Sequence, residues 1–172
     1  MSTRRAAAVV LLATARAALP GQFDVGPADS TSPLIQSLVS DDTARFEQLL
    51  AVGADVNVLD VITPLYAAQE YVRNSRQRHA ALRRLLRAGA MADGTTQDGS
   101  TTLMLAAYHG DVRSAQLLLD HGANPLRENM QGFHAIDAAH KGGHDELGAM
   151  LREHLGESGV RVMAERRSKE EL

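Results

Sequence analysis

Three of the Gly-Ala pairs along the chain each follow two consecutive leucines by the same interval. The pairs begin at Gly53, Gly89 and Gly122, and the second leucine lies three positions before each glycine. The last two glycines are 33 residues apart, and Leu103 and Ile136 are again 33 residues apart. A repeat of this length indicates stacked copies of one small supersecondary unit, because a single copy cannot bury its own apolar face.

The units are not equal in length. The distance from Leu34 to Leu65 is 31 residues, whereas the distance from Leu65 to Leu103 is 38. The excess of five residues over the 33-residue period lies between Thr63 and Leu85. We therefore expect the two helices of the second unit to be longer than those of its neighbours. A fourth, weaker copy begins at residues 134–136, and its polar substitutions are typical of a repeat that caps the end of a stack.

A unit of this period with T-P-L-x-x-A and then L-L-x-x-G-A resembles the ankyrin repeat. Residues 98–125 (DGSTTLMLAAYHGDVRSAQLLLDHGANP) are the best match, and the resemblance extends from about residue 30 to 155. It implies an all-α solenoid of about four helix-turn-helix repeats with finger loops that resemble β-hairpins. The repeats would span about 30–58, 59–93, 98–125 and 131–155.

Local chemistry agrees with this register. Thr63 can accept a backbone N–H bond at a helix start, and Pro64 suits the first turn, where its missing N–H costs nothing. Each repeated glycine stands where a helix must end in the left-handed conformation. We expect helices near residues 33–39, 43–52, 64–74, 77–88, 102–109, 112–121, 135–141 and 145–154.

Composition limits which side chains can form the core and which kinds of site the chain can carry. Aromatic residues make up 3% of the chain and Trp is absent, so Leu, Ala, Val and Ile must form the core. The absence of Cys excludes disulfides, thiolate catalysis and Cys-based zinc sites. The net charge of -3 gives no global case for nucleic-acid binding.

Both ends of the chain carry distinct patterns. Residues 1–19 begin with Arg4 and Arg5, continue with a short apolar run and end with small residues at A-x-A spacing, which is typical of a secretory signal. The other interpretation is an Ala-rich helix that packs on the domain end. A cleaved signal predicts a periplasmic or secreted protein, and its retention predicts a cytoplasmic one. Residues 156–172 are charged, and they form either a tail or a short capping helix.

The sequence contains no pattern that would carry catalysis. His140 and His144 are four residues apart, but the two glycines between them break the helical spacing, and no H-E-x-x-H is present. There is also no G-x-S-x-G and no Gly-rich phosphate loop. We therefore expect no enzyme activity, no metal and no cofactor. The family resemblance implies that His144 holds the backbone between repeats.

The resemblance implies that a protein partner binds the finger tips and the exposed face of the inner helices. The concentration of aromatic and Met side chains at these positions favours an interface. The other interpretation is that Tyr66 and Tyr108 pack between repeats. The matching positions are Ile62, Tyr66, Glu70, Tyr71, Gln97, Asp98, Ser100, Met104, Tyr108, His109, Met130, Gln131, Phe133, Asp137 and Lys141.

Three functions are compatible with these patterns. The first is a module that binds and modulates another protein. The second is an immunity protein that inhibits a toxic enzyme, a role that bacterial ankyrin proteins of similar size and signal sequence imply. The third is nucleic-acid binding through the basic run at Arg73, Arg76, Arg78, Arg83, Arg84 and Arg87. We favour a solvated outer helix face as the explanation of this run, and an acidic patch on a protein partner is the main functional alternative.

Overall fold

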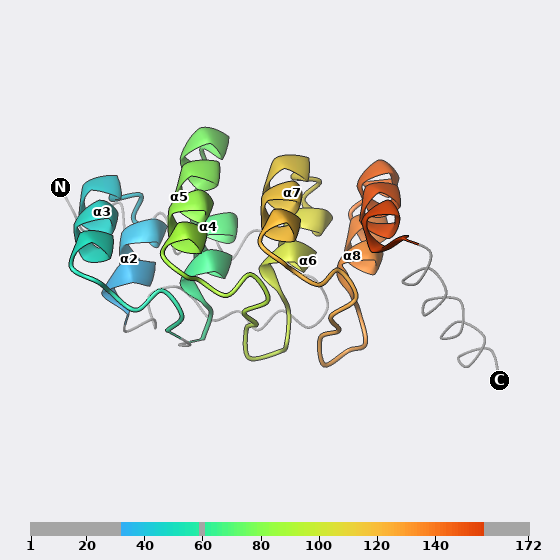
Figure 1. Cartoon of the computed structure of the whole chain (residues 1–172), viewed down its shortest axis with the longest axis horizontal. Coiled ribbons are helices and arrows are strands. Elements are labelled where there is room, and N and C mark those ends of the chain that lie inside the picture. Colours follow the sequence, from blue (N-terminus) through green and yellow to red (C-terminus); the bar gives the residue numbers. More distant parts are fainter. Residues whose placement is uncertain (1–31, 59–60, 157–172) are drawn as a thin grey trace.

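The computed structural model describes residues 32–58 and 61–156, and in this part of the chain pairs of helices stand side by side in a row (Figure 1). One row of helices contacts its neighbours in the order α2, α4, α6, α8, and α3 and α5 pack against α2 and α4. The predicted all-α solenoid is confirmed. The helices are α2 (Pro33–Val39), α3 (Thr43–Ala51), α4 (Pro64–Tyr71), α5 (Ser75–Arg87), α6 (Thr102–Tyr108), α7 (Val112–Asp120), α8 (Ala135–Lys141) and a final helix over 145–156.

The inner helices begin at the residues that the repeat predicted. The Thr63 hydroxyl accepts a hydrogen bond from the Tyr66 backbone N–H at 3.2 Å, and α4 starts with a proline in its first turn. Thr101 caps α6 in the same way, accepting from the Met104 N–H at 3.2 Å. His134 takes the capping position of α8. The two threonine caps satisfy N–H groups that have no partner inside the helix.

The outer helices end where the glycines predict. Gly89 has a φ of 91°, its N–H donates to the Leu86 carbonyl, and the Ala90 N–H donates to the Leu85 carbonyl at 3.0 Å. This pair of bonds is the Schellman arrangement, which needs a left-handed residue at that position. The same bonds recur around the glycines that follow α3 and α7.

Small side chains let the inner helices approach one another. Ala68, Ala107 and Ala139 are fully buried on α4, α6 and α8. Leucines of the outer helices, such as Leu82 and Leu118, cover the inner helices and are also fully buried. The core is thus a continuous layer that each repeat shares with its neighbours, as expected when no single unit can bury its own apolar face.

The five extra residues of the second unit lie in its helices, as predicted. The second helix α5 has 13 residues where α7 has nine, and α4 has eight where α6 has seven. In Figure 1, α5 rises past α3 and α7 at the edge of the row opposite the finger loops. The insertion therefore leaves the fingers in register.

The predicted boundary between α4 and α5 was wrong. The sequence predicted a first helix to residue 74 and a second from residue 77, but α4 ends at Tyr71 and α5 begins at Ser75. Val72 has an extended backbone, and the Asn74 side chain accepts hydrogen bonds from the N–H groups of Arg76 and Gln77. Asn is a strong N-cap, and this local bond starts α5 two residues early.

The third and fourth repeats touch through glycine. A Cβ added to Gly142 would lie 2.1 Å from the Tyr108 carbonyl oxygen, so the backbones of the two repeats are in direct contact there. Gly110, which has a φ of 69°, packs under the ring of His144, and an added Cβ would lie 2.5 Å from that ring. The position of His144 between the two repeats agrees with the structural role that the resemblance implied.

Side chains also tie successive finger loops together. The Asn57 side chain donates to the Gly89 carbonyl at 2.9 Å and accepts from the Met91 N–H at 2.7 Å. One repeat later, Asp93 accepts from the Asn124 N–H at 2.8 Å. These bonds fix the spacing of the loops. The predictions for residues 1–19 and for the tail from residue 157 onward lie outside the described residues.

Candidate protein-binding surface

Three of the residues expected to contact a partner belong to the core. Ile62, Tyr66 and Met104 are 8%, 7% and 6% exposed. The Met104 sulfur lies 3.4 Å from the Thr101 backbone nitrogen, from which it accepts a hydrogen bond at the start of α6. Tyr66 follows its capping threonine by the same interval, and it is buried at the matching position of α4. The expectation that these side chains are exposed was wrong. Tyr66 and Met104 pack into the repeat stack three positions after their caps, and Ile62 is buried directly before the cap of α4.

The third finger loop is organised around the Asp98 carboxylate. It accepts hydrogen bonds from the Ser100 hydroxyl at 2.8 Å, from the Ser100 N–H at 3.2 Å and from the Thr96 hydroxyl. Gln97 is exposed beside it, whereas Asp98 and Ser100 are partly exposed. Asp98 and Ser100 therefore shape the finger, and Gln97 is the side chain that the finger presents to solvent.

The fourth finger is shaped by Asn129, a residue that the sequence analysis missed. Its side-chain oxygen accepts from the N–H groups of Gln131 and Phe133, each at 3.0 Å, and its own N–H donates to the Phe133 carbonyl. Asn readily bonds the backbone two residues ahead, and a glycine three positions later supports a tight turn. The sequence N-M-Q-G-F therefore contained the signal. The Met130 N–H also donates to the Asp98 carbonyl at 2.9 Å, which joins the two fingers.

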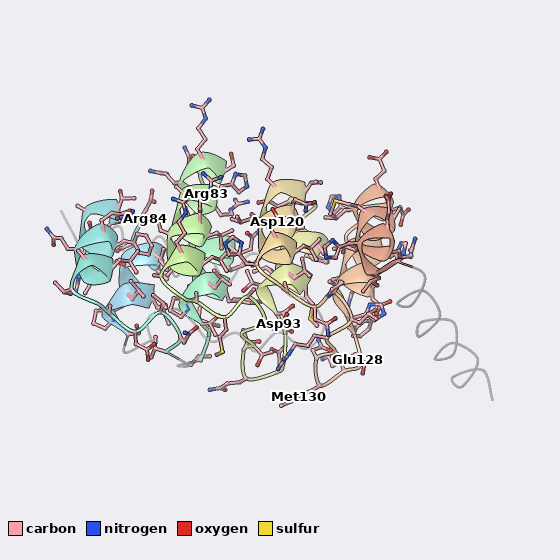
Figure 2. All side chains as sticks on the ribbon, viewed as in Figure 1. Arg83, Arg84, Asp93, Asp120, Glu128 and Met130 are labelled. Atoms are coloured by element: carbon pink, nitrogen blue, oxygen red, sulfur yellow. The ribbon has the colours of Figure 1, made fainter. Side chains whose placement is uncertain are left out.

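Large apolar side chains are exposed on this ordered loop. Met130 is 80% exposed at the free end of the finger, and Phe133 is 41% exposed (Figure 2). The Lys141 ammonium group lies 5.2 Å from the centre of the Phe133 ring, a cation–π contact that holds the ring at the surface. We call Gln97, Met130, Gln131, Phe133 and Lys141 the finger surface.

The remaining predicted residues lie on the inner helices. Glu70 and Tyr71 on α4, and Tyr108 and His109 at the end of α6, are all partly exposed. The rings of Tyr108 and His109 are 5.6 Å apart, and Tyr71 and Tyr108 pack against the core. Tyr108 thus combines both interpretations, since one part of it packs and another part faces solvent.

Asp137 is a structural carboxylate at the start of α8. It accepts a hydrogen bond from the His134 N–H at 3.1 Å, and its Oδ2 lies 2.8 Å from His134 Nδ1. That nitrogen is also 3.3 Å from the Asp137 backbone N–H, but the shorter contact makes it a donor to the carboxylate. Burial would raise the pKa of Asp137, but the hydrogen bonds and charge of His134 outweigh burial and hold the pKa below its usual value.

A charged cluster that the sequence analysis did not identify joins the second and third repeats. Asp111 caps α7. Its carboxylate oxygens also lie 2.9 Å from Arg78 Nη1 and 3.0 Å from His79 Nε2, and both of these residues belong to the lengthened α5. Arg78 Nε also donates to the Val72 carbonyl at 3.0 Å. Because Arg78 and Asp111 are 33 residues apart, one repeat period, aligning the units could have paired them.

The hydrogen bonds of Asp111 outweigh its burial. Burial of the carboxylate would raise its pKa, but the bonds from the Ser114 N–H, from His79, from the Ser114 hydroxyl and from Arg78 hold the pKa well below its usual value. Within residues 32–58 and 61–156, no three His, Asp or Glu side chains gather as metal ligands would. None of the helices in the same residues is long and apolar enough to cross a membrane.

Comparison with known proteins agrees with the geometry. The family model for ankyrin repeats, which spans three copies, matches residues 33–129 and again residues 65–162. The chain is 37% identical over 125 residues to the human ankyrin repeat and SOCS box protein 11, and the match covers 71% of this chain and 36% of the relative. It is 40% identical over 102 residues to the mouse nuclear factor NF-kappa-B p105 subunit, a match that covers 57% of this chain and 10% of the relative.

A bacterial protein is similar to the same extent. The putative ankyrin repeat-containing protein of Treponema pallidum is 38% identical over 88 residues, covering 51% of this chain and 29% of the relative. The chain therefore spans about a third or less of the length of these relatives. Ankyrin-repeat proteins generally mediate protein–protein interaction through the extended surface of the stacked repeats. The helix pairs, the glycine-terminated outer helices and the match of the family model together show that the chain belongs to the ankyrin-repeat family.

Proposed function

We propose that this protein binds a protein partner through the finger surface and thereby modulates the partner. The observation that supports this function is the exposure of Met130 and Phe133 on a loop that hydrogen bonds hold in place. Among the described aromatic side chains, Phe133 is the exposed one, while Phe46 is buried in the core. Aromatic residues and Met are enriched at the cores of protein interfaces, and a preformed loop loses little entropy on binding.

The charge and polarity around these residues fit the same role. Gln97 and Gln131 can form hydrogen bonds with a partner's backbone, and the Lys141 ammonium group lies over the Phe133 ring. The partly exposed Tyr108 and His109 extend the surface from the fingers onto the end of α6. An apolar centre with a polar rim is the usual composition of a protein-binding site.

Replacing Phe133 or Met130 with alanine is expected to weaken partner binding by at least about 2 kcal/mol, roughly 30-fold, if they occupy the centre of the interface. The measurement begins with affinity purification of the tagged protein from its native cell and identification of the protein that co-elutes. Titration of that purified partner against each variant by calorimetry then gives the change in affinity.

Val112→Ala provides the matched control. Val112 is 50% exposed at the start of α7, and the substitution removes a similar kind of exposed apolar group away from the finger surface. We expect its affinity for the partner to match the unmodified protein. Equal affinities for all variants would show that the partner binds elsewhere.

An activity assay of the purified partner, titrated with this protein, separates two kinds of modulation. An inhibitor, such as an immunity protein that neutralises a toxic enzyme, would extinguish the activity of an enzymatic partner at one-to-one stoichiometry. An adaptor would bind without abolishing activity. A nucleic-acid binder would instead lose affinity for nucleic acid steeply as salt is added.

We also propose that the segment 1–19 contains an export signal that is cleaved after Ala15 or Ala17, which would place the mature protein in the periplasm or outside the cell. The support is the basic start, the apolar run and the small residues at Ala13, Ala15 and Ala17. N-terminal sequencing of the protein purified from its native cell is expected to begin at Arg16 or Ala18. Detection of Met1 or Ser2 would show that the segment is retained.

A further inference from the structure

The outer face of α5 carries a row of arginines. Arg76, Arg83 and Arg87 are spaced i, i+7 and i+11, which places them within about 40° of one another around the helix axis. All three are exposed, and the exposed residue between them on the same face is the small Ala80. The row is about 16 Å long, from the rise of 1.5 Å per residue in a helix. We call Arg76, Arg83 and Arg87 the arginine stripe.

The extra first turn of α5 contributes Arg76 to this stripe and adds no buried residue to the core. The buried residues of α5 are Ala81, Leu82, Leu85 and Leu86, all in its second half. The first turn buries no apolar side chain, and Arg78 and His79 fix it to Asp111 of the next repeat. Arg78 therefore holds the first turn of α5 in place. Arg76, two residues earlier, is exposed to solvent.

The stripe is not neutralised by its surroundings. α5 contains no Asp or Glu, and none of the three stripe arginines forms an ion pair within the described part of the chain. The adjacent Arg84 does form one, with Glu47 of α3. Arg83 and Arg87 repel each other at i, i+4, and Arg76 opposes the helix dipole in the first turn, whereas the dipole favours Arg87 in the last turn. An acidic neighbour would relieve the repulsion between Arg83 and Arg87 and would compensate the charge of Arg76.

We propose that the arginine stripe is a second interaction surface, which docks an acidic face of a protein. Guanidinium groups bind carboxylates with two parallel hydrogen bonds, so a row of carboxylates at matching spacing is the chemistry that fits. Nucleic acid fits less well. Nucleic-acid binders neutralise many phosphates and add stacking side chains, whereas the stripe offers three cations and no aromatic residue on a chain of net charge -3.

This surface is separate from the finger surface. Figure 2 shows Arg83 on α5, away from Met130, which lies at the tips of the fingers. The two can therefore be tested independently, and loss of one does not require loss of the other.

The test uses a fluorescein-labelled helical peptide that carries glutamates at i, i+7 and i+11. Its binding to the full chain is followed by fluorescence anisotropy at low and at physiological salt. The triple variant Arg76→Gln/Arg83→Gln/Arg87→Gln is expected to bind about tenfold more weakly, and the binding of the unmodified protein should weaken with added salt. The same peptide with glutamines in place of glutamates should not bind.

A charge-matched control distinguishes the stripe from net charge. The variant Arg45→Gln/Arg113→Gln/Arg127→Gln removes three exposed arginines on α3, α7 and the fourth finger, and it should retain binding within about twofold. The stripe variant should melt no lower than the unmodified protein, because its arginines repel one another. Equal weakening by the two variants would overturn the proposal, as would no binding of the glutamate peptide. A short DNA duplex or single-stranded RNA bound more tightly than the peptide, and lost on the stripe variant, would replace the protein partner with nucleic acid.

Discussion

Replacing Gly142 with alanine is expected to lower the free energy of unfolding by about 3 kcal/mol and the melting temperature by roughly 10 °C. The reason is geometric. A Cβ at this position would lie 2.1 Å from the Tyr108 carbonyl oxygen, and that oxygen belongs to the backbone, so no side-chain rotation relieves the overlap. The third and fourth repeats must separate to admit the methyl group. Urea denaturation followed by circular dichroism measures the loss.

Gly148→Ala is the matched control in the same repeat. Gly148 lies inside the final helix, and an added Cβ would meet the His140 ring at 3.5 Å and the Ala139 Cβ at 3.6 Å, which are ordinary contact distances. Alanine is the better residue inside a helix, so this variant should gain about 0.5–1 kcal/mol. Hydrogen exchange then shows which repeat loses stability, because the amide groups of α8 should exchange before those of α2 in the Gly142 variant. Equal stabilities of the two variants would show that the repeats do not touch at Gly142.

Removing the Asp111 side chain is expected to have the second largest effect, a loss of about 3 kcal/mol. Asp111→Ala deletes the cap of α7, which is worth about 1 kcal/mol, and leaves Arg78 and His79 without the carboxylate that binds them. The side chains of Arg78, His79 and Asp111 are only 19%, 16% and 12% exposed, so water compensates poorly for the missing carboxylate. Chemical denaturation of the variant measures this loss.

Asp42→Ala is the control for the cap alone. Asp42 occupies the same position in the first repeat, where it accepts from the Arg45 N–H at 3.0 Å. Its removal should cost about 1 kcal/mol. If the two alanine variants lost the same stability, the contacts of Asp111 with α5 would contribute nothing.

The pH dependence of Asp111 follows from the direction of its pKa shift. Folding lowers the pKa, so the stabilisation is fully present above the unfolded value of about 3.9 and disappears as the pH falls through the lower folded value. The unmodified protein should lose stability on the acid side of about pH 4. Asp111→Asn keeps a capping oxygen but has no proton to gain, so its stability should fall less steeply over the same range.

The sequence was sufficient for the fold because the repeat carries redundant information. Thr63 marks a helix start, Gly89 marks a helix end, and both recur at the period, so several units report the same architecture. The location of the five-residue excess followed from spacing alone. The boundary after Tyr71 did not, because it depends on which of several polar residues caps α5, and Asn74 competes locally for that role.

The binding surface was less predictable than the fold. The period places Tyr66 and Met104 on the inner helices, but it does not state how deeply the neighbouring repeat covers them. Met104 is drawn inward by its sulfur contact with the Thr101 N–H, a contact that apolar periodicity does not encode. The 33-residue spacing could have paired Arg78 with Asp111, but the run of arginines does not show which of the others remain at the surface, since that depends on the packing of α5 against α7.

The finger loops and the α4–α5 connection lie at opposite edges of the row, and within the described residues the extra length of the second repeat lies at the edge of the α4–α5 connection. Because α5 grows away from the fingers, the lengths of the two edges can vary independently. A short epitope or a fluorophore attachment site introduced at Arg73 would therefore report on the protein without shifting the loops that carry Met130 and Phe133. Such a label offers a practical way to follow partner capture in solution.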